Sequence, residues 1–230
     1  MTVIERIAIW LLPVMFAIII HEIAHGWAAL RLGDTTAKSL GRLSLNPIRH
    51  IDPVGSIVVP GLLLLMSTGF IFGWARPVPI NASRLHNPRR DMMVVAIAGP
   101  FSNLMMLLFW AFVFKTGLLV DGGESATGFV MIHMGAAGIF INAVLMMLNL
   151  LPIPPLDGSR VVEGLLPLPW AVKYNQFGRY GLLVLMGLMF TGLLGSVLWP
   201  LISVAIVGST FAANLPLDVL SQAFGNLFGT

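Results

Sequence analysis

Long apolar runs separated by short polar segments dominate this sequence. A helix that crosses a membrane needs about 20 consecutive apolar residues, and five runs reach that length, of which the one at 54–73 is a poor helix. The pattern therefore predicts an all-α polytopic membrane protein with about four spanning helices, organised as a single domain over residues 1–230. The predicted core helices cover about 7–30, 91–114 and 129–151, an additional helix covers about 180–199, and a short helix is a further candidate at 200–213.

The region at about 38–73 departs from this pattern. Residues 39–47 alternate between polar and apolar side chains and end at turn-forming residues, which predicts a short strand in a membrane-associated β-hairpin. Residues 54–73 are apolar and long enough to span, but Pro60 and three glycines make this run a poor helix. Basic residues flank it on both sides, and because such flanks favour the cytoplasm, both of its ends should lie there. We therefore expect a re-entrant segment.

Composition narrows the class of protein further. Hydrophobic residues make up 57% of the chain and charged residues 10%, a balance that excludes an ordinary soluble domain. The 13 Lys and Arg residues lie beside the apolar runs, where they indicate membrane topology rather than nucleic-acid binding. The sequence has no cysteine, which excludes disulfides and thiolate metal ligands. A cleavable signal peptide is an alternative for the first run, but apolar character resumes after His25, which favours a retained helix.

The first apolar run contains the motif His21-Glu22-Ile23-Ala24-His25. Side chains four positions apart lie on nearly the same face of a helix, so His21 and His25 can bind one metal ion while Glu22 stands beside a metal-bound water. Ionisable residues are costly inside a membrane helix and usually mark function. The motif therefore predicts a hydrolytic zinc site with one Zn²⁺ per chain.

Catalytic zinc needs a third protein ligand, and Asp157 is the strongest candidate. It follows the helix predicted at 129–151, whose end is broken by three prolines, and a carboxylate there would be costly without a partner. If residues 54–73 are re-entrant, this helix runs parallel to the first, and Asp157 reaches the depth of His21 and His25. The alternative is that Asp157 caps the helix that follows it.

Asn149 lies eight residues before Asp157 and carries an amide donor that suits a developing oxyanion. A hydrogen bond between helices is an equally good interpretation of this residue. Four other titratable residues are interpreted as structural, supporting or non-catalytic rather than as ligands: His50, Asp52, His86 and His133.

Together these residues resemble the site-2 protease family of intramembrane zinc metalloproteases. The matching motifs are His21-Glu22-x-x-His25, Gly99-Pro100-x-x-Asn103 and Asn149-x-x-Pro152-x-x-x-x-Asp157-Gly158. The resemblance implies zinc binding by His21, His25 and Asp157. It also implies a general base at Glu22 and an amide near the scissile carbonyl at Asn149. The chain resembles a minimal form of the family, without a PDZ or CBS domain.

This resemblance implies an intramembrane endopeptidase that hydrolyses a peptide bond within or near a transmembrane segment. Its expected partners are a membrane-anchored protein substrate and the lipid bilayer, and we assign no oligomeric state. We expect the plasma or inner membrane of a prokaryote, with the site toward the cytoplasm because basic residues follow the first helix. The alternative is a non-catalytic metal-binding or metal-transporting membrane protein, which would not need Glu22 as a base.

Overall fold

The computed structural model describes residues 1–58, 62, 73 and 75–229, and this part of the chain contains helices and no strand. The all-α class predicted from the sequence is therefore confirmed for the described residues. The elements in chain order are α1 (Val3–Arg31), α2 (Thr36–Ser39), η1 (Pro47–Arg49), η2 (Pro53–Val58), η3 (Ala82–Arg84), α4 (Pro88–Asp121), α5 (Ala126–Asn149), α6 (Asp157–Leu165), α7 (Leu168–Phe177), η4 (Gly178–Tyr180), α8 (Gly181–Phe190), α9 (Leu193–Ala213) and α10 (Leu217–Phe228).

Helices α1, α4, α5 and α9 are each long and apolar enough to cross a membrane. This agrees with the predicted multi-pass protein of about four spans. The last span is not where the sequence pattern placed it, because residues 180–199 do not form one helix. Gly192 has a φ of 75°, a conformation that favours glycine, and it separates α8 from α9. The second half of the predicted helix therefore continues through 200–213 as α9.

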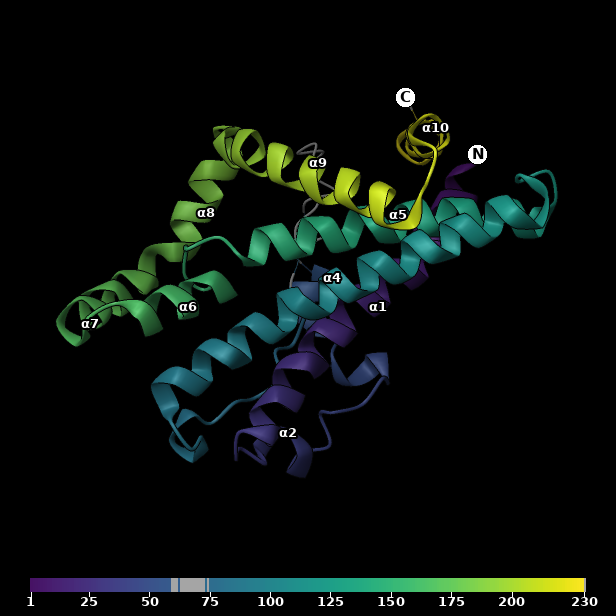
Figure 1. Ribbon diagram of the computed structural model, residues 1–230. Helices are drawn as coiled ribbons and strands as arrows, with labels where there is room; N and C mark the ends of the chain where they lie inside the picture. Colours follow the sequence, from purple (N-terminus) through teal and green to yellow (C-terminus); the bar gives the residue numbers. More distant parts are fainter. Residues whose placement is uncertain (59–61, 63–72, 74, 230) are drawn as a thin grey trace.

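Helices α1, α4 and α5 form the centre of the molecule, and α4 and α5 lie side by side (Figure 1). Glycines allow the close approach of α5 to α4. A Cβ atom at Gly135 would come within 2.6 Å of Phe114 Cβ, and one at Gly138 would overlap the Trp110 ring. Small residues are typical of closely packed membrane helices. This packing holds the second half of α4 against α5.

The segment between α1 and α4 returns to the end of α1. The backbone N–H of His86 donates to Leu32 O at 3.0 Å, and that of Asn81 donates to Asp34 Oδ2 at 2.6 Å. The start of α4 therefore lies beside the end of α1, and a short turn after α4 leads into α5. As a result α5 runs in the same direction as α1. Most of the predicted re-entrant run at 54–73 lies outside the described residues.

The β-hairpin predicted after the first helix is not found in the described part of this region, where α2, η1 and η2 lie instead. Local hydrogen bonds explain the difference. Asn46 Oδ1 accepts a hydrogen bond from Ile48 N at 3.0 Å, and Asp34 Oδ1 accepts one from Thr36 N at 2.9 Å. Short polar side chains that bind nearby backbone favour turns over strand pairing, so the alternating pattern did not produce a strand.

Helix α10 packs near the start of α1, so the two chain termini lie close together (Figure 1). The Trp10 ring centroid is 6.0 Å from that of Phe140 on α5 and 5.8 Å from that of Phe228 on α10. Trp10 precedes His21 by about 16 Å along the helix axis, at 1.5 Å per residue. The C-terminal helix therefore covers the end of the bundle remote from the motif.

Candidate metal centre

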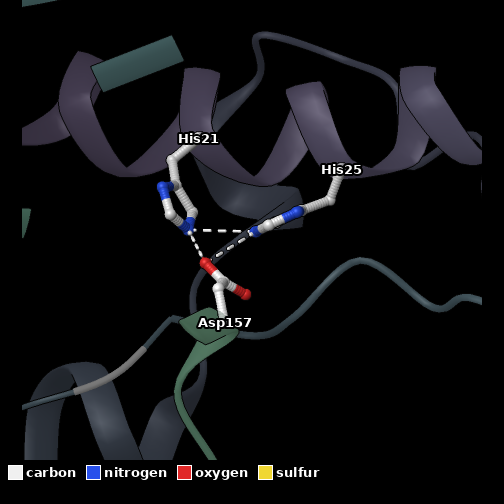
Figure 2. A group of neighbouring side chains, drawn as sticks. All are labelled: His21, His25 and Asp157. Carbon is white, nitrogen blue, oxygen red and sulfur yellow. Dashed lines mark hydrogen bonds and ion pairs between the residues drawn. The ribbon is translucent and has the colours of Figure 1, made fainter. Parts of the chain in front are cut away.

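His21 and His25 project from the same face of α1 toward the start of α6 (Figure 2). Both side chains are buried, with exposed residue fractions of 8% and 7%. Their Nε2 atoms are 3.0 Å apart, because residues one helical turn apart share a face. The structure thus brings the two predicted histidine ligands together.

Asp157 faces the two histidines from the first position of α6 (Figure 2). Its Oδ2 is 3.2 Å from His21 Nε2 and 3.3 Å from His25 Nε2. Of the described residues, these three make up a group of side chains that could hold a metal ion. The carboxylate predicted as the third ligand therefore lies at the depth of the two histidines.

The backbone around Asp157 explains why its carboxylate is free to face α1. The N-cap of α6 is Leu156, which makes no side-chain capping bond, so helix capping by Asp157 does not describe the structure. Gly158 lies against the end of α5, where a Cβ atom would meet the Leu150 and Leu151 carbonyls. This close contact holds Asp157 beside the end of α5 and opposite α1.

The three facing atoms fit a zinc ion. Bonds of about 2.0–2.1 Å to N and O ligands in a tetrahedral site place neighbouring ligand atoms about 3.3 Å apart. The observed separations are 3.0, 3.2 and 3.3 Å. Buried Oδ2 of Asp157 has no hydrogen-bond partner. A set of three electron-pair donors of this kind suits a cation. Two imidazoles and one carboxylate leave a fourth tetrahedral position open for water or substrate.

The other ring nitrogen of each histidine is held by α4. His21 Nδ1 donates to Asn103 Oδ1 at 2.6 Å, and His25 Nδ1 donates to the Val95 carbonyl at 2.7 Å. Because both Nδ1 atoms carry the proton, both Nε2 atoms present a lone pair to the metal position. The sequence motif contains Asn103 but indicates no role for it, and the Val95 carbonyl was not predicted.

Asn103 is itself fixed by a buried amide network. Its Nδ2 donates to Ala17 O at 3.2 Å and to Asn142 Oδ1 at 2.9 Å, and Asn142 Nδ2 donates to Gly138 O at 2.9 Å. Both asparagines are fully buried. The network joins α1, α4 and α5 and keeps the Asn103 oxygen directed at His21. A sequence signal was available, because asparagines inside apolar membrane helices need partners.

Gly99 is the point at which α4 passes directly beside the two candidate ligands His21 and His25. A Cβ atom there would come within 2.6 Å of His21 Cε1 and closer still to His25 Nε2. Any larger residue would therefore displace one of the two rings. The glycine of the Gly99-Pro100 motif is explained by this contact, and not by backbone flexibility.

Glu22 and Asn149 differ in how they relate to this group. Glu22 follows His21 directly, is half-buried, and its Oε2 accepts a hydrogen bond from the Val78 backbone N–H at 2.7 Å. Asn149 is the last residue of α5, and its Nδ2 donates to Leu145 O at 3.0 Å within its own helix. The contact of Asn149 lies within its own helix and does not test a catalytic role, so that role stays a prediction.

We expect Asn103→Leu to weaken zinc binding by about 10–100-fold, because the His21 ring loses the acceptor that fixes its orientation. Competition of the purified protein with a chromophoric zinc chelator measures this change. Asn226→Leu is the matched control, since Asn226 contacts His133 Nε2 at 3.2 Å on a different part of the bundle. Equal zinc affinity in the two variants would contradict the assigned role of Asn103.

Comparison with known proteins places the chain in a family. It is 42% identical over 185 residues to the Bacillus subtilis protein named "Putative zinc metalloprotease YwhC", and the match covers 80% of each chain. The chain belongs to this zinc metalloprotease family. Rip2 of Mycobacterium tuberculosis, a relative with the same description, is 31% identical over 158 residues, which make up 68% of this chain and 55% of that protein. No family model and no solved structure matches the chain.

Membership of a zinc metalloprotease family agrees with the donor set found in the structure. Imidazole nitrogens and a carboxylate oxygen are ligands that zinc accepts, and three of them with one open position are typical of catalytic rather than structural zinc. The comparison indicates zinc, and the structure groups three side chains that could hold it, His21, His25 and Asp157.

Proposed function

We propose that this metalloprotease is an intramembrane endopeptidase of the site-2 type, which cuts a membrane-anchored protein within or near its transmembrane segment. The observation that carries the proposal is the location of the donor set. Two ligands lie inside α1, a helix apolar enough to span a membrane, and the third follows α5, another such helix. A hydrolytic centre there acts on peptide bonds at membrane depth.

The proposed reaction divides the chemistry between zinc and Glu22. A zinc ion held by His21, His25 and Asp157 would polarise the peptide carbonyl as a Lewis acid and would lower the pKa of the attacking water. Glu22 takes the proton from that water and passes it to the leaving amine. Asn149 contributes its amide to the developing oxyanion, which requires Nδ2 to turn away from Leu145 O.

We further propose that the centre lies toward the cytoplasmic side of a prokaryotic membrane. Helix α1 ends at Arg31 and is followed by Lys38 and Arg42. Arg84 precedes α4, and Arg89 and Arg90 lie at the start of α4. Basic residues of this kind concentrate in cytoplasmic loops. Because the motif lies near the cytoplasmic end of α1 in this proposal, a substrate would reach it from the cytoplasm.

A metal-dependent cleavage assay tests the proposed activity. The reporter has one transmembrane helix with an Asn-Pro pair in its cytoplasmic half, because proline removes a backbone hydrogen bond and exposes a carbonyl. We expect purified protein in liposomes to cut this reporter, to lose activity on zinc chelation, and to regain it with Zn²⁺ but not Mg²⁺. The control reporter has Leu-Leu in place of Asn-Pro. Cleavage that persists in metal-free protein would refute the proposal.

A further inference from the structure

A segment without helix or strand, residues 75–81, lies against the face of α1 that carries Glu22. Val78 in this segment is buried, with 5% of the residue exposed, and its backbone N–H donates to Glu22 Oε2 at 2.7 Å. The two residues are 56 positions apart in the sequence. The proposed reaction uses Glu22 but gives no reason for this contact.

The sequence around Val78 makes its N–H the one donor of the Pro77-Val78-Pro79 tripeptide. Neither proline has a backbone N–H, so neither can compete for the carboxylate. Residues that precede a proline are restricted to extended conformations, and both Arg76 and Val78 are in that position. The segment is therefore set in an extended form that offers a single N–H to Glu22.

Hydrogen bonds on both sides hold this segment in place. Arg76 N donates to His50 O at 2.8 Å, and Arg42 Nη2 donates to Arg76 O at 2.8 Å. On the other side, Asn81 N donates to Asp34 Oδ2 at 2.6 Å. Arg42 and Asp34 are both buried. The donor that Glu22 contacts is consequently part of a fixed backbone, not of a mobile side chain.

Gly26 lets the segment come this close to α1. It lies one helical turn after Glu22, on the same face. A Cβ atom at Gly26 would come within 2.8 Å of Val78 Cγ1 and 2.6 Å of Leu43 Cδ2. A side chain at this position would push the segment away from the carboxylate.

We propose that Val78 is a positioning residue whose backbone N–H fixes the Glu22 carboxylate. With Oε2 held by this bond, Oε1 is the oxygen left to take the proton from water. An N–H can only donate, so Oε2 is the acceptor in this bond. The bond keeps Oε2 directed at the Val78 nitrogen. This inference rests on the proposed role of Glu22 as general base.

Val78→Pro and Val78→Ala separate the N–H from the side chain. Proline removes the N–H and keeps the extended backbone, whereas alanine keeps the N–H and removes the side-chain methyl groups. We expect the maximal single-turnover rate on the Asn-Pro reporter to fall about 10–100-fold in Val78→Pro, with bound zinc and half-saturating reporter concentration unchanged. Val78→Ala should cleave at nearly the wild-type rate. Equal rates for the two variants, or a faster Val78→Pro, would overturn the inference.

Gly26→Ala decides the question if Val78→Pro fails to fold. We expect the same loss of maximal rate, because the added methyl displaces Val78 from Glu22. Combining it with Val78→Ala should restore part of the rate, since the clash with Cγ1 is removed. Trp27→Ala is the control, as Trp27 is exposed on the same helix. A Gly26→Ala protein with the wild-type rate would refute the positioning role.

Hydrogen exchange separates failure of this inference from failure of the proposed function. In Glu22→Ala, the amides of residues 75–81 should exchange faster than in wild type, because Val78 N–H loses its acceptor. This readout requires no activity. Unchanged exchange overturns the positioning role alone. Faster exchange in a protein whose wild type cuts no reporter supports the contact and overturns the proposed protease function.

Discussion

Glu22→Gln abolishes reporter cleavage while zinc remains bound, if Glu22 acts as the general base. A positioned base contributes about 10²–10⁴-fold to a reaction rate, and glutamine has nearly the same shape but accepts no proton. Zinc should stay because Glu22 is not among the three side chains that could hold it, which are His21, His25 and Asp157. The measurement pairs metal analysis of the purified protein with the initial rate on the Asn-Pro reporter.

Glu124→Gln is the matched control for this variant. Glu124 is exposed in the turn between α4 and α5, so the same chemical change there should leave the rate unaltered. A Glu22→Gln protein with the wild-type rate would remove the mechanism. The alternative of a metal-binding or metal-transporting protein makes that opposite prediction, because binding and transport need no base.

The sequence was sufficient to predict that the candidate ligands lie together, because helix periodicity relates spacing along the chain to position in space. His21 and His25 are four residues apart, and a helix places them on one face whatever surrounds it. Asp157 was reached by a second argument, which required the helix before it to run parallel to α1. The segment that ends at His86 returns to the end of α1, so α4 runs opposite to α1, and α5 runs parallel to α1.

The parts of the centre that the sequence did not predict depend on backbone atoms and on contacts between helices. The acceptor for His25 is the Val95 carbonyl and the donor to Glu22 is the Val78 N–H. Every residue type offers a backbone carbonyl, so residue identity carries no signal for it. Asn103 could be recognised as a polar residue in an apolar run. Its partner, His21, follows only from the way α4 crosses α1.

The two differences in the fold have local causes that periodicity does not register. Residues 39–47 alternate as a strand does, yet Asn46 Oδ1 accepts a hydrogen bond from the Ile48 backbone N–H, and the chain enters η1. The apolar run at 180–199 is continuous, yet Gly192 takes a positive φ and starts a new helix. In both places, the conformational preference of one residue outweighed a hydrophobic pattern that extends over many residues.

Asp157→Ala should remove most of the zinc and, with it, the stabilisation that zinc provides. A ligand present at a hundred times its dissociation constant stabilises a folded protein by about 2.7 kcal/mol. We therefore expect added zinc to raise the Tm of the wild-type protein and to leave that of Asp157→Ala unchanged. Loss of one of three ligands should exceed the 10–100-fold effect of losing a residue that only orients a ligand.

Asp218→Ala distinguishes ligation from a general effect of helix charge. Asp218 lies in the first turn of α10, as Asp157 lies in the first turn of α6, and negative charge in a first turn stabilises a helix by about 0.3–1 kcal/mol. Both substitutions remove that contribution, but Asp218 is exposed and outside the metal-binding group. Asp218→Ala should therefore keep the zinc-dependent rise in Tm. If Asp157→Ala keeps it too, the third ligand is not Asp157, and the link between α5 and the two histidines of α1 is structural rather than catalytic.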